Sequence, residues 1–343
     1  MFRAGIVGCG RIGSQFDDDP KRKVVSTHAG AYFAVNEVEL VAACDLDEEK
    51  LARCGQKWQI PSLYQDYREM LGKENLDILS ICTWNSTHLD ITREAVNNGV
   101  RAIFCEKPIA DSLKSAGEMI NLCHEKGVIL QIDHKRRFDR FHQEIKSFLQ
   151  DERLGRIQQV TFYYVSGIAN AGSHMFDLLR FFFGDIDWVQ AIYSQNESHN
   201  PDDPNIDGMV KFKNGIFGSI QACDVRDFYI FEMDCLGTKG RLNITRDGFD
   251  LDFYEVGQSK LFSEDMDLFH SASPINSDVP REFMVEAVRH LVECLTKGKK
   301  SLSSGEDGRA ALELICAFHE SARADGKRIN LPMKDSKIEI KSR

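Results

Sequence analysis

The sequence lacks the features that would place it in a membrane, on a nucleic acid or around a metal ion. No apolar run approaches the ~20 residues that a helix needs to cross a bilayer. The formal net charge is −10, and the largest basic cluster, Lys135-Arg136-Arg137, is too short to follow a phosphate backbone. No cysteines are spaced C-x-x-C and no histidines H-x-x-x-H. We therefore expect no bound metal and no nucleic-acid or membrane partner.

The chain also lacks a basic start followed by an apolar stretch, which a secretory signal would require. Its 10 cysteines lie mostly in apolar, strand-like runs, where cysteine behaves as a small hydrophobic residue. We expect reduced thiols in a cytoplasmic protein. There is no Pro-rich linker, repeat or low-complexity tract, and 343 residues suffice for two domains with substantial cores.

An apolar strand at the start of the chain continues into a glycine-rich turn. The segment 5–13, Gly-Ile-Val-Gly-Cys-Gly-Arg-Ile-Gly, contains a G-x-G-x-x-G pattern, and the next strand, 38–45, ends in Asp45. Such glycines let the backbone approach a pyrophosphate, and the helix N-terminus that follows offers N–H groups. A carboxylate at Asp45 accepts hydrogen bonds from ribose hydroxyls and repels a 2′-phosphate. These features predict binding of NAD rather than NADP, through Gly8, Gly10, Arg11, Ile12, Gly13, Asp45 and Leu46.

The spacing departs from the usual fingerprint in one respect. Asp45 lies further from the glycines than the usual ~20 residues. A polar segment, 16–25, separates the turn from the helix expected near 26–34. We therefore expect an insert, which is either a flap over the active site or a solvated loop.

Strand-like and helix-like segments alternate through the first part of the chain. Strands are expected at 76–83, 101–105 and 128–132, and helices at 47–57, 86–98 and 112–126. This alternation predicts a doubly wound parallel sheet, so the fold class is α/β with an N-terminal Rossmann domain over residues 1–134.

The pattern changes beyond residue 135. A helix at 138–150 precedes strands at 156–165, 188–193, 208–213, 216–223, 229–237 and 240–245, and several of these are joined by short glycine-containing turns. Helices at 281–296 and 308–324 follow. We expect a C-terminal α+β domain, residues 135–343, on a large, mostly antiparallel open sheet that serves substrate binding and oligomerisation. The final helix could return to the first domain.

Two segments carry candidate chemistry. Glu106-Lys107-Pro108 follows the fourth strand, at the sheet edge where a nicotinamide and a substrate would meet. Asn170, His174 and Asp177 are spaced four and three residues apart, and in a helix they would share one face. Taken singly, a lysine before proline is often a solvated loop residue, and a histidine at a helix start is often a cap.

Together, behind the glycine turn, these segments make the chain resemble the glucose–fructose oxidoreductase / inositol dehydrogenase / MocA (Gfo/Idh/MocA) family over nearly its whole length. The segment 82–88, Cys-Thr-Trp-Asn-Ser-Thr-His, is similar to that family's Thr-Pro-Asn-x-x-His turn. Arg136-Arg137-Phe138 after the fifth strand and the segment 304–308, Ser-Gly-Glu-Asp-Gly, add to the resemblance.

The resemblance implies an NAD-dependent dehydrogenase that acts on a CH–OH group of a sugar, cyclitol or nucleotide-linked amino sugar. Hydride would pass between the substrate carbon and the nicotinamide, Lys107 would hold the reacting oxygen, and His174 would be the general acid/base. Further cofactor contacts are implied for Thr83, Trp84, Asn85, His88, Glu106 and Lys107. Substrate contacts are implied for Lys107, Arg136, Arg137, Asn170, His174 and Asp177.

The chain departs from the family pattern at two positions. Asn170 stands where inositol dehydrogenase-like members have an aspartate, which makes His174 a weaker base and leaves more proton chemistry to Lys107. Asn-x-Gly-x-His also resembles the branch that oxidises nucleotide-linked amino sugars. Trp84 stands where proline is usual, either as a stacking wall for sugar or cofactor or in ordinary packing.

Two further expectations concern activity and assembly. A non-catalytic sugar or dinucleotide sensor is the alternative on the same fold, and the presence of both Lys107 and His174 favours the enzyme. The segment 228–235 carries more large side chains than one solvated sheet face normally does. This predicts a homodimer or homotetramer packed sheet to sheet.

Overall fold

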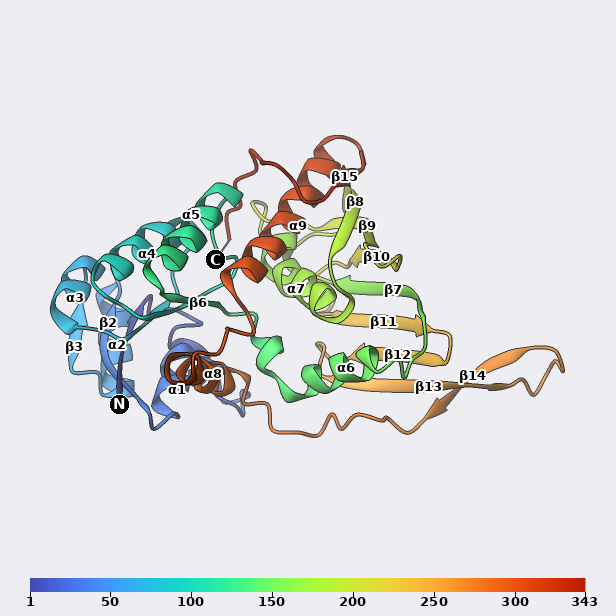
Figure 1. The fold of residues 1–343 in the computed structure, drawn as a ribbon, viewed down its shortest axis with the longest axis horizontal. Coiled ribbons are helices and arrows are strands. Elements are labelled where there is room, and N and C mark those ends of the chain that lie inside the picture. The colour runs from blue at the N-terminus through green and yellow to red at the C-terminus, as the bar shows by residue number, and fades with distance from the viewer. Residues whose placement is uncertain (343) are drawn as a thin grey trace. The chain divides into compact units, whose positions relative to one another are not determined.

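The computed structural model describes residues 1–342, which form two compact units (Figure 1). The first unit combines Met1–Asp139, Arg281–Leu312 and residues 340–342, and the second combines Arg140–Pro280 and Glu313–Glu339. Helix α9 (Gly305–Arg323) contributes to both units. The first unit is therefore discontinuous, whereas the sequence analysis ends the first domain at residue 134 and allows only the final helix to return to it.

A six-stranded parallel sheet forms the centre of the first unit, as predicted. Its strand order is β3-β2-β1-β4-β5-β6. The strands are β1 (Phe2–Val7), β2 (Val38–Cys44), β3 (Ser62–Tyr64), β4 (Ile78–Ile81), β5 (Ala102–Cys105) and β6 (Ile129–Ile132). All residues of β4 and β5 are buried, which is typical of strands with helices on both faces of the sheet. The sequence analysis missed only the short edge strand β3.

Besides the first part of α9, the helices of the first unit are η1 (Gln15–Asp18), α1 (His28–Phe33), α2 (Glu48–Trp58), α3 (Tyr67–Glu74), η2 (Asn85–Thr87), α4 (His88–Asn97), α5 (Leu113–Lys126), η3 (Lys135–Phe138) and α8 (Phe283–Lys297). Side chains cap the first turns of α1, α2, α3 and α5. The Ser112 side chain caps α5 by accepting from Ser115 N, and Gly127 ends it with φ +67°.

Helix α8 belongs to the first unit because its apolar stripe packs there. Met284, Ala287, Val288 and Leu291 are fully buried, and the helix contacts α1, β6 and η3. Gln131 in β6 donates its side-chain N–H to the Ala287 carbonyl over 3.0 Å. The burial of this stripe explains why the chain returns to the first unit after the second sheet is complete.

The predicted insert is looped out of a helix. Ile12 O accepts a hydrogen bond from His28 N, and Gly13 O accepts one from Ala29 N, at 3.1 and 3.0 Å. In a continuous α-helix residues 16 and 17 would donate these bonds, so 12 residues have been added between the glycine turn and α1. Without them Asp45 would lie 20 positions after Gly13, which is the usual spacing of ~20.

Polar contacts at the base of the insert hold it together. Asp17 accepts hydrogen bonds from Ser26 N (2.7 Å) and from the Thr27 hydroxyl. Thr27 in turn caps α1 by accepting from Gly30 N over 3.0 Å. Asp18 binds Arg53 and Lys57 of α2, both at 2.7 Å. The insert is therefore a loop that its own carboxylates tie to α1 and α2.

A nine-stranded, mostly antiparallel sheet forms the second unit, as predicted. Its order is β14-β13-β12-β11-β7-β10-β9-β8-β15, and only β7 and β10 pair in parallel. The strands are β7 (Ile157–Tyr164), β8 (Ile186–Tyr193), β9 (Ile206–Phe212), β10 (Phe217–Ala222), β11 (Phe231–Gly237), β12 (Gly240–Thr245), β13 (Asp250–Gln258), β14 (Met266–Ser271) and β15 (Ile329–Asn330). The sequence analysis did not foresee β13, β14 or β15.

Helices cover one face of this sheet. They are α6 (Arg140–Gln150), the π-helical turn η4 (Gly167–Ala171), α7 (Gly172–Phe183) and the second part of α9. Phe231, Met233 and Cys235 of β11 are buried, whereas Glu232 and Asp234 alternate with them on the other face. Within β11 the large side chains therefore lie on the buried face, whereas Phe228 and Tyr229 of the segment 228–235 precede the strand and are exposed.

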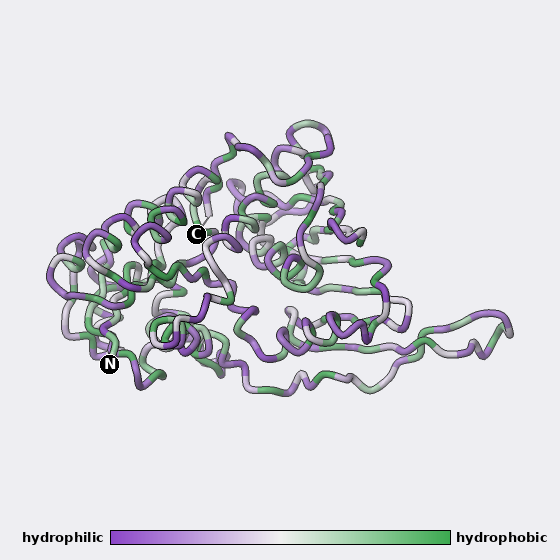
Figure 2. The backbone as a smooth tube through the Cα atoms, viewed as in Figure 1, coloured by the Kyte–Doolittle hydropathy of each residue, from purple (hydrophilic) through white to green (hydrophobic). Residues whose placement is uncertain are grey.

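Strands β13 and β14 extend beyond the other strands of their sheet as a hairpin (Figure 1). Hydrophobic and polar residues are mixed along this hairpin (Figure 2). The apolar side chains near its tip are exposed, with Leu261 at 81%, Phe262 at 64% and Met266 at 59%, whereas Leu251 and Phe253 of β13 are buried. Phe228 and Tyr229, just before β11, are also more than half exposed.

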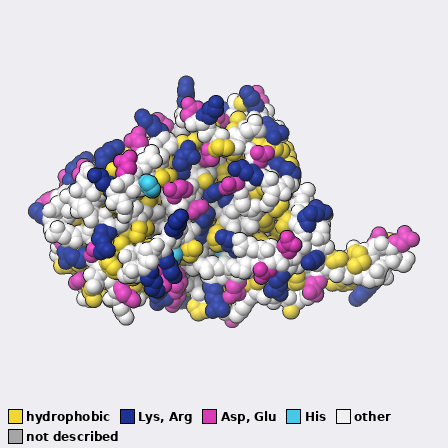
Figure 3. Space-filling view, in the orientation of Figure 1, with side chains coloured by type: hydrophobic (Ala, Val, Ile, Leu, Met, Phe, Trp, Pro, Cys, Tyr) yellow, Lys and Arg dark blue, Asp and Glu magenta, His cyan; other side chains and the backbone are white. Residues whose placement is uncertain are grey.

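Charged side chains are spread over the surface in Figure 3, and the cysteines of the described residues form no disulfides with one another. Basic and acidic side chains are interspersed over the face shown in Figure 3. All ten cysteines are free thiols, and Cys9 packs in the core against Ala43, Leu51 and Cys54. Across residues 1–342, every helix is too short or too polar to traverse a bilayer.

Candidate active site

The glycine turn leaves room for a ligand at one position. Gly8 has φ +99°, and a Cβ there would lie 2.6 Å from the Cys82 carbonyl oxygen. A Cβ at Gly13 would collide with the carbonyl oxygen of Gly8. A Cβ at Gly10, in contrast, would meet no atom within 4 Å. The first and third glycines are thus required by the fold itself, and the second leaves the open cradle that a pyrophosphate needs.

Asp45 follows β2 at the same edge of the sheet. Its Oδ2 accepts a hydrogen bond from Cys9 N over 2.7 Å, and its Oδ1 accepts one from Asp47 N over 2.9 Å. The carboxylate therefore braces the glycine turn, and each oxygen keeps a lone pair for a ribose hydroxyl. Leu46 beside it is 87% exposed. This donor and acceptor set fits the adenosine half of NAD.

Some side chains of the loop after β4 face the surface, and others face the interior of the first unit. Trp84 is 49% exposed, and the Thr83 and Thr87 hydroxyls bind each other over 2.7 Å. Asn85 is buried and donates to the carbonyls of Ala110 and Ile340, while its Oδ1 accepts from Ser342 N. Trp84 and Thr83 therefore offer atoms to the outside, whereas Asn85 ties the loop to two distant segments.

His88 also points inward. Its ring nitrogens lie 3.0 Å from the Ile109 carbonyl oxygen and 3.2 Å from that of Thr83, and burial lowers its pKa. The resemblance implies cofactor contacts for Asn85 and His88. In the structure both side chains are occupied by backbone groups of the first unit, so they shape the loop and do not present their own atoms at its surface.

Lys107 follows β5 at the carboxyl edge of the parallel sheet. The register pairs Val7 with Ile81 and Ile81 with Cys105, so Gly8, Cys82 and Glu106 follow neighbouring strands. Glu106 itself is buried, and its Oε1 lies 3.0 Å from His28 Nε2. Lys107 is half-buried. The glycine turn and the lysine therefore lie on one edge of one sheet, which is where α/β sheets bind dinucleotides and their substrates.

A buried polar cluster beneath this edge was missed from the sequence. His28 Nδ1 lies 2.8 Å from the Ser80 hydroxyl, which lies 2.7 Å from the Tyr32 hydroxyl. Asp133, directly after β6, has its Oδ2 4.0 Å from His28 Nε2. Burial lowers the pKa of His28 to about 4, although Asp133 opposes this shift. The sequence could have pointed to Glu106 and Asp133, because each is a polar residue that directly follows a buried strand.

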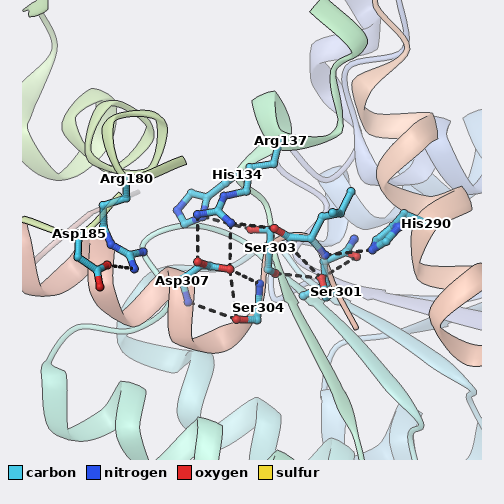
Figure 4. A network of polar contacts seen from close by, with 11 residues as sticks. His134, Arg137, Arg180, Asp185, His290, Ser301, Ser303, Ser304 and Asp307 are labelled. Carbon is cyan, nitrogen blue, oxygen red and sulfur yellow. Dashed lines mark hydrogen bonds and ion pairs between the residues drawn. The ribbon is translucent and has the colours of Figure 1, made fainter. Parts of the chain in front are cut away.

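The two arginines after β6 are buried in the first unit. Arg137 pairs with Asp307 at 3.0 Å and donates to the Leu302 carbonyl over 2.8 Å (Figure 4). Asp307 Oδ2 also accepts from Ser304 N, and His134 Nδ1 contacts the Ser303 hydroxyl. A substrate contact was implied for Arg137, but its guanidinium is engaged in this network. Arg136 is 5% exposed.

Asn170, His174 and Asp177 lie in the second unit. Asn170 lies in η4, and the other two residues lie in α7, which continues from it. Asn170 is exposed, His174 is half-buried and Asp177 is 1% exposed. The predicted helix therefore exists, but its first turn is π-helical, and the three side chains lie at different depths.

Asp203 anchors this turn and was not foreseen. Its carboxylate accepts from Ala169 N over 2.7 Å and from Asn170 N over 2.9 Å. Gly167 has φ +90°, and a Cβ at this position would collide with Asp203. Asn205 accepts from Gly167 N over 3.0 Å. The segment 203–205 thus holds the backbone that presents Asn170 and His174.

Comparisons with known proteins identify the family. Residues 2–134 match the oxidoreductase family with an NAD-binding Rossmann fold, and residues 167–331 match the C-terminal alpha/beta domain of the same family. D-apiose dehydrogenase of Paraburkholderia graminis is 27% identical over 96% of this chain and 90% of its own length. Myo-inositol 2-dehydrogenase of Thermotoga maritima is 24% identical over 93% of this chain and 96% of its own length.

Solved structures share the fold. The WlbA dehydrogenase of Bordetella pertussis, in complex with NADH and UDP-GlcNAcA, has a TM-score of 0.77 and 23% identity over 97% of this chain and 99% of its own. Levoglucosan dehydrogenase, in complex with NADH and levoglucosan, has a TM-score of 0.80 and 17% identity over 97% and 100%. The chain is therefore an oxidoreductase of the Gfo/Idh/MocA family, with an NAD-binding Rossmann domain and a C-terminal α/β domain.

Proposed function

We propose that this oxidoreductase transfers a hydride between NAD and a secondary alcohol of a sugar, cyclitol or nucleotide-linked sugar. The observation that carries the proposal is the shared sheet edge of the glycine turn, Asp45 and Lys107 in the first unit. NAD, when bound, supplies the nicotinamide carbon that accepts the hydride. Relatives named D-apiose dehydrogenase and myo-inositol 2-dehydrogenase support the substrate class.

We assign one task in this reaction to each of the following residues. Gly10 admits the pyrophosphate, Asp45 holds the adenosine ribose, and Thr83 and Trp84 line the nicotinamide side. The Lys107 ammonium holds the substrate oxygen and stabilises its developing negative charge. His174 takes the hydroxyl proton, and Asn170 orients its ring. Asp177, being buried, supports α7 from within.

A nucleotide-linked amino sugar is the substrate that we propose within this class. Asn170 is neutral where an aspartate would strengthen the base, His174. A reaction with a weaker base relies more on binding energy, which a substrate supplies through many contacts outside the reacting centre. The WlbA structure, which shares the fold, contains UDP-GlcNAcA. A preference for free cyclitols over nucleotide sugars would contradict this part of the proposal.

Steady-state turnover with a panel of sugars, cyclitols and nucleotide sugars tests the function. Lys107→Ala should lower kcat on the order of 100-fold at every pH, because it removes the group that stabilises the oxyanion. Lys114→Ala is the matched control, since Lys114 is a surface lysine with 88% side-chain exposure, paired only loosely with Glu118. Equal activity of both variants would refute the role of Lys107.

The sensor alternative predicts a different result from the same panel. A sensor would bind NADH and a sugar without turnover, and Lys107→Ala would change affinity only. Turnover that depends on Lys107 excludes this alternative.

We also propose that the protein is a homodimer or homotetramer. The exposed apolar side chains of Leu261, Phe262 and Met266 on the β13–β14 hairpin, together with Phe228 and Tyr229, support an interface. Light scattering at micromolar concentration should give a mass above that of the 38.9 kDa chain. Leu261→Ser with Phe262→Ser should lower this mass. A monomer before substitution would contradict the proposal.

A further inference from the structure

Two carboxyl groups that the proposed reaction does not use are buried side by side next to Lys107. Glu106 follows β5 and Asp133 follows β6, and the register pairs Cys105 with Ile132. The ligand atoms of His28, Glu106 and Asp133 lie within 4.8 Å of one another, so the two carboxyl groups are close neighbours. Glu106 is 7% exposed and Asp133 is 2% exposed.

Two negative charges are unfavourable at this place. Two like charges this close together and away from water oppose each other's ionisation, and the pKa of one group is raised. Within residues 1–342, Asp133 Oδ1 is buried and has no hydrogen-bond partner. An ionised carboxylate with such an orphaned oxygen would carry the full cost of desolvation. Neutral Asp133 avoids this cost.

The groups around the pair do not outweigh the effect of burial on a second charge. They are His28 and Tyr32 of α1, Ser80 and Cys82 at β4, Cys105 and Lys107 at β5, and Lys135 after β6. Lys107 and Lys135 lower the pKa of Glu106, but burial raises it by more. Burial, and then the charge of Glu106, raise the pKa of Asp133 to about 7. His28 stays neutral because burial holds its pKa near 4.

One arrangement of protons provides a donor for each hydrogen bond of the cluster. Tyr32 donates to Ser80 over 2.7 Å, and Ser80 donates to His28 Nδ1 over 2.8 Å. His28 Nε2–H then donates to Glu106 Oε1 over 3.0 Å, and Lys107 N donates to Glu106 Oε2 over 3.3 Å. A protonated Asp133 adds one more donor. Glu106 is left as the single carboxylate, and every other member is neutral.

We propose that Asp133 is a positioning residue that carries one proton shared with Glu106 and thereby fixes the Glu106 carboxylate beside Lys107. The role of Lys107 in this inference rests on the proposed function. With one shared proton the pair carries a single negative charge next to the ammonium of Lys107. A second negative charge would draw the ammonium toward the pair and away from the substrate oxygen.

Infrared spectroscopy of the cofactor-free protein tests the shared proton without any need for turnover. We expect the C=O band of one protonated carboxyl at about pH 6.5, where ordinary carboxyl groups are ionised, and its loss as the pH rises to about 9. Asp133→Asn should lack the band, and Asp90→Asn, at an exposed carboxylate, should retain it. No such band in the wild-type protein, or an unchanged band in Asp133→Asn, would overturn the proposal. One divalent metal ion per wild-type chain, lost in Asp133→Asn, would also overturn it.

Kinetics test the positioning role. The side-chain amide introduced by Asp133→Asn can still donate to Glu106, so kcat should stay within about threefold of wild type. Asp133→Leu removes the donor and should lower kcat on the order of 10-fold, with the KM for NAD little changed. Circular dichroism checks that both variants fold. Wild-type kcat in a folded Asp133→Leu would refute the positioning role. A wild-type protein with the carboxyl band but without turnover on any substrate would instead refute the proposed function.

Discussion

Replacement of Asp45 tests how the first unit distinguishes NAD from NADP. The carboxylate already accepts hydrogen bonds from Cys9 N and Asp47 N, at 2.7 and 2.9 Å. Bound NAD would add hydrogen bonds from the ribose hydroxyls, and a bond to a charged acceptor contributes about 1.5–3 kcal/mol. Asp45→Ser should therefore lose about 3 kcal/mol, which weakens NADH binding about 100-fold.

The affinity for NADPH should respond in the opposite sense. Removing the carboxylate removes its repulsion of a 2′-phosphate, so NADPH should bind Asp45→Ser as tightly as it binds wild type or more tightly. Loss of the bond to Cys9 N loosens the glycine turn, but this affects both cofactors alike. The ratio of the two dissociation constants therefore isolates the role of the carboxylate at the ribose.

Fluorescence titration with NADH and NADPH measures this ratio. Asp47→Ser is the matched control, because it removes the same charge two residues further on. Asp47 caps α2 by accepting from Glu49 N and Lys50 N at 3.1 Å, and serine is also a favourable cap. The control should keep the wild-type ratio within about threefold. Tighter binding of NADPH than NADH by wild type, or equal ratios in the two variants, would refute the reasoning.

Four further predictions concern acid–base chemistry, stability and the insert. Asn170→Asp should raise the pKa of His174 by its added negative charge and move the acidic limb of the pH–rate profile to higher pH; an unchanged profile would contradict the assigned role. The pKa of Asp133 is higher in the folded protein (about 7) than in the unfolded chain (about 3.9), so stability should fall as the pH rises between these values, by up to about 4 kcal/mol, and Asp133→Asn should lose this slope in urea denaturation. Arg137→Met leaves the partly buried Asp307 without its partner and should lower the free energy of unfolding by about 3 kcal/mol, whereas Arg140→Met at an exposed pair should cost less than about 1. Deleting residues 16–27 should join α1 directly to the glycine turn and keep the fold and NADH binding; loss of turnover in this variant would show that the insert is a flap.

Local patterns in the sequence were sufficient to predict the parallel sheet and its functional edge. The glycines, Asp45 and Lys107 each follow a short apolar strand, and the carboxyl ends of parallel strands meet at one edge. The excess spacing before Asp45 also correctly indicated an insert. These inferences needed only neighbours along the chain and the rule that alternating strands and helices form a parallel sheet.

Contacts between distant segments could not be predicted in this way. Asn85 resembles a cofactor residue, but its amide binds the carbonyl of Ile340, which is 255 positions away. Asp133 meets Glu106 only because β5 and β6 pair in one register. The π-helical turn at Gly167 depends on Asp203, which comes from a loop after β8. The role of such a side chain depends on the groups that it contacts, and tertiary packing decides which groups these are.

The discontinuous first unit has a consequence for folding during synthesis. The ribosome makes residues 140–280 before it makes α8, which covers α1 and β6. A nascent chain that ends near residue 139 would therefore expose the apolar surface that Met284, Val288 and Leu291 later bury. The anchor of Asn85 to residues 340–342 forms later still. Sheet strands β1 to β6 can pair early, but the loop beside Lys107 reaches its final form only after the second unit has been synthesised, so chaperones would meet an incomplete dinucleotide-binding unit.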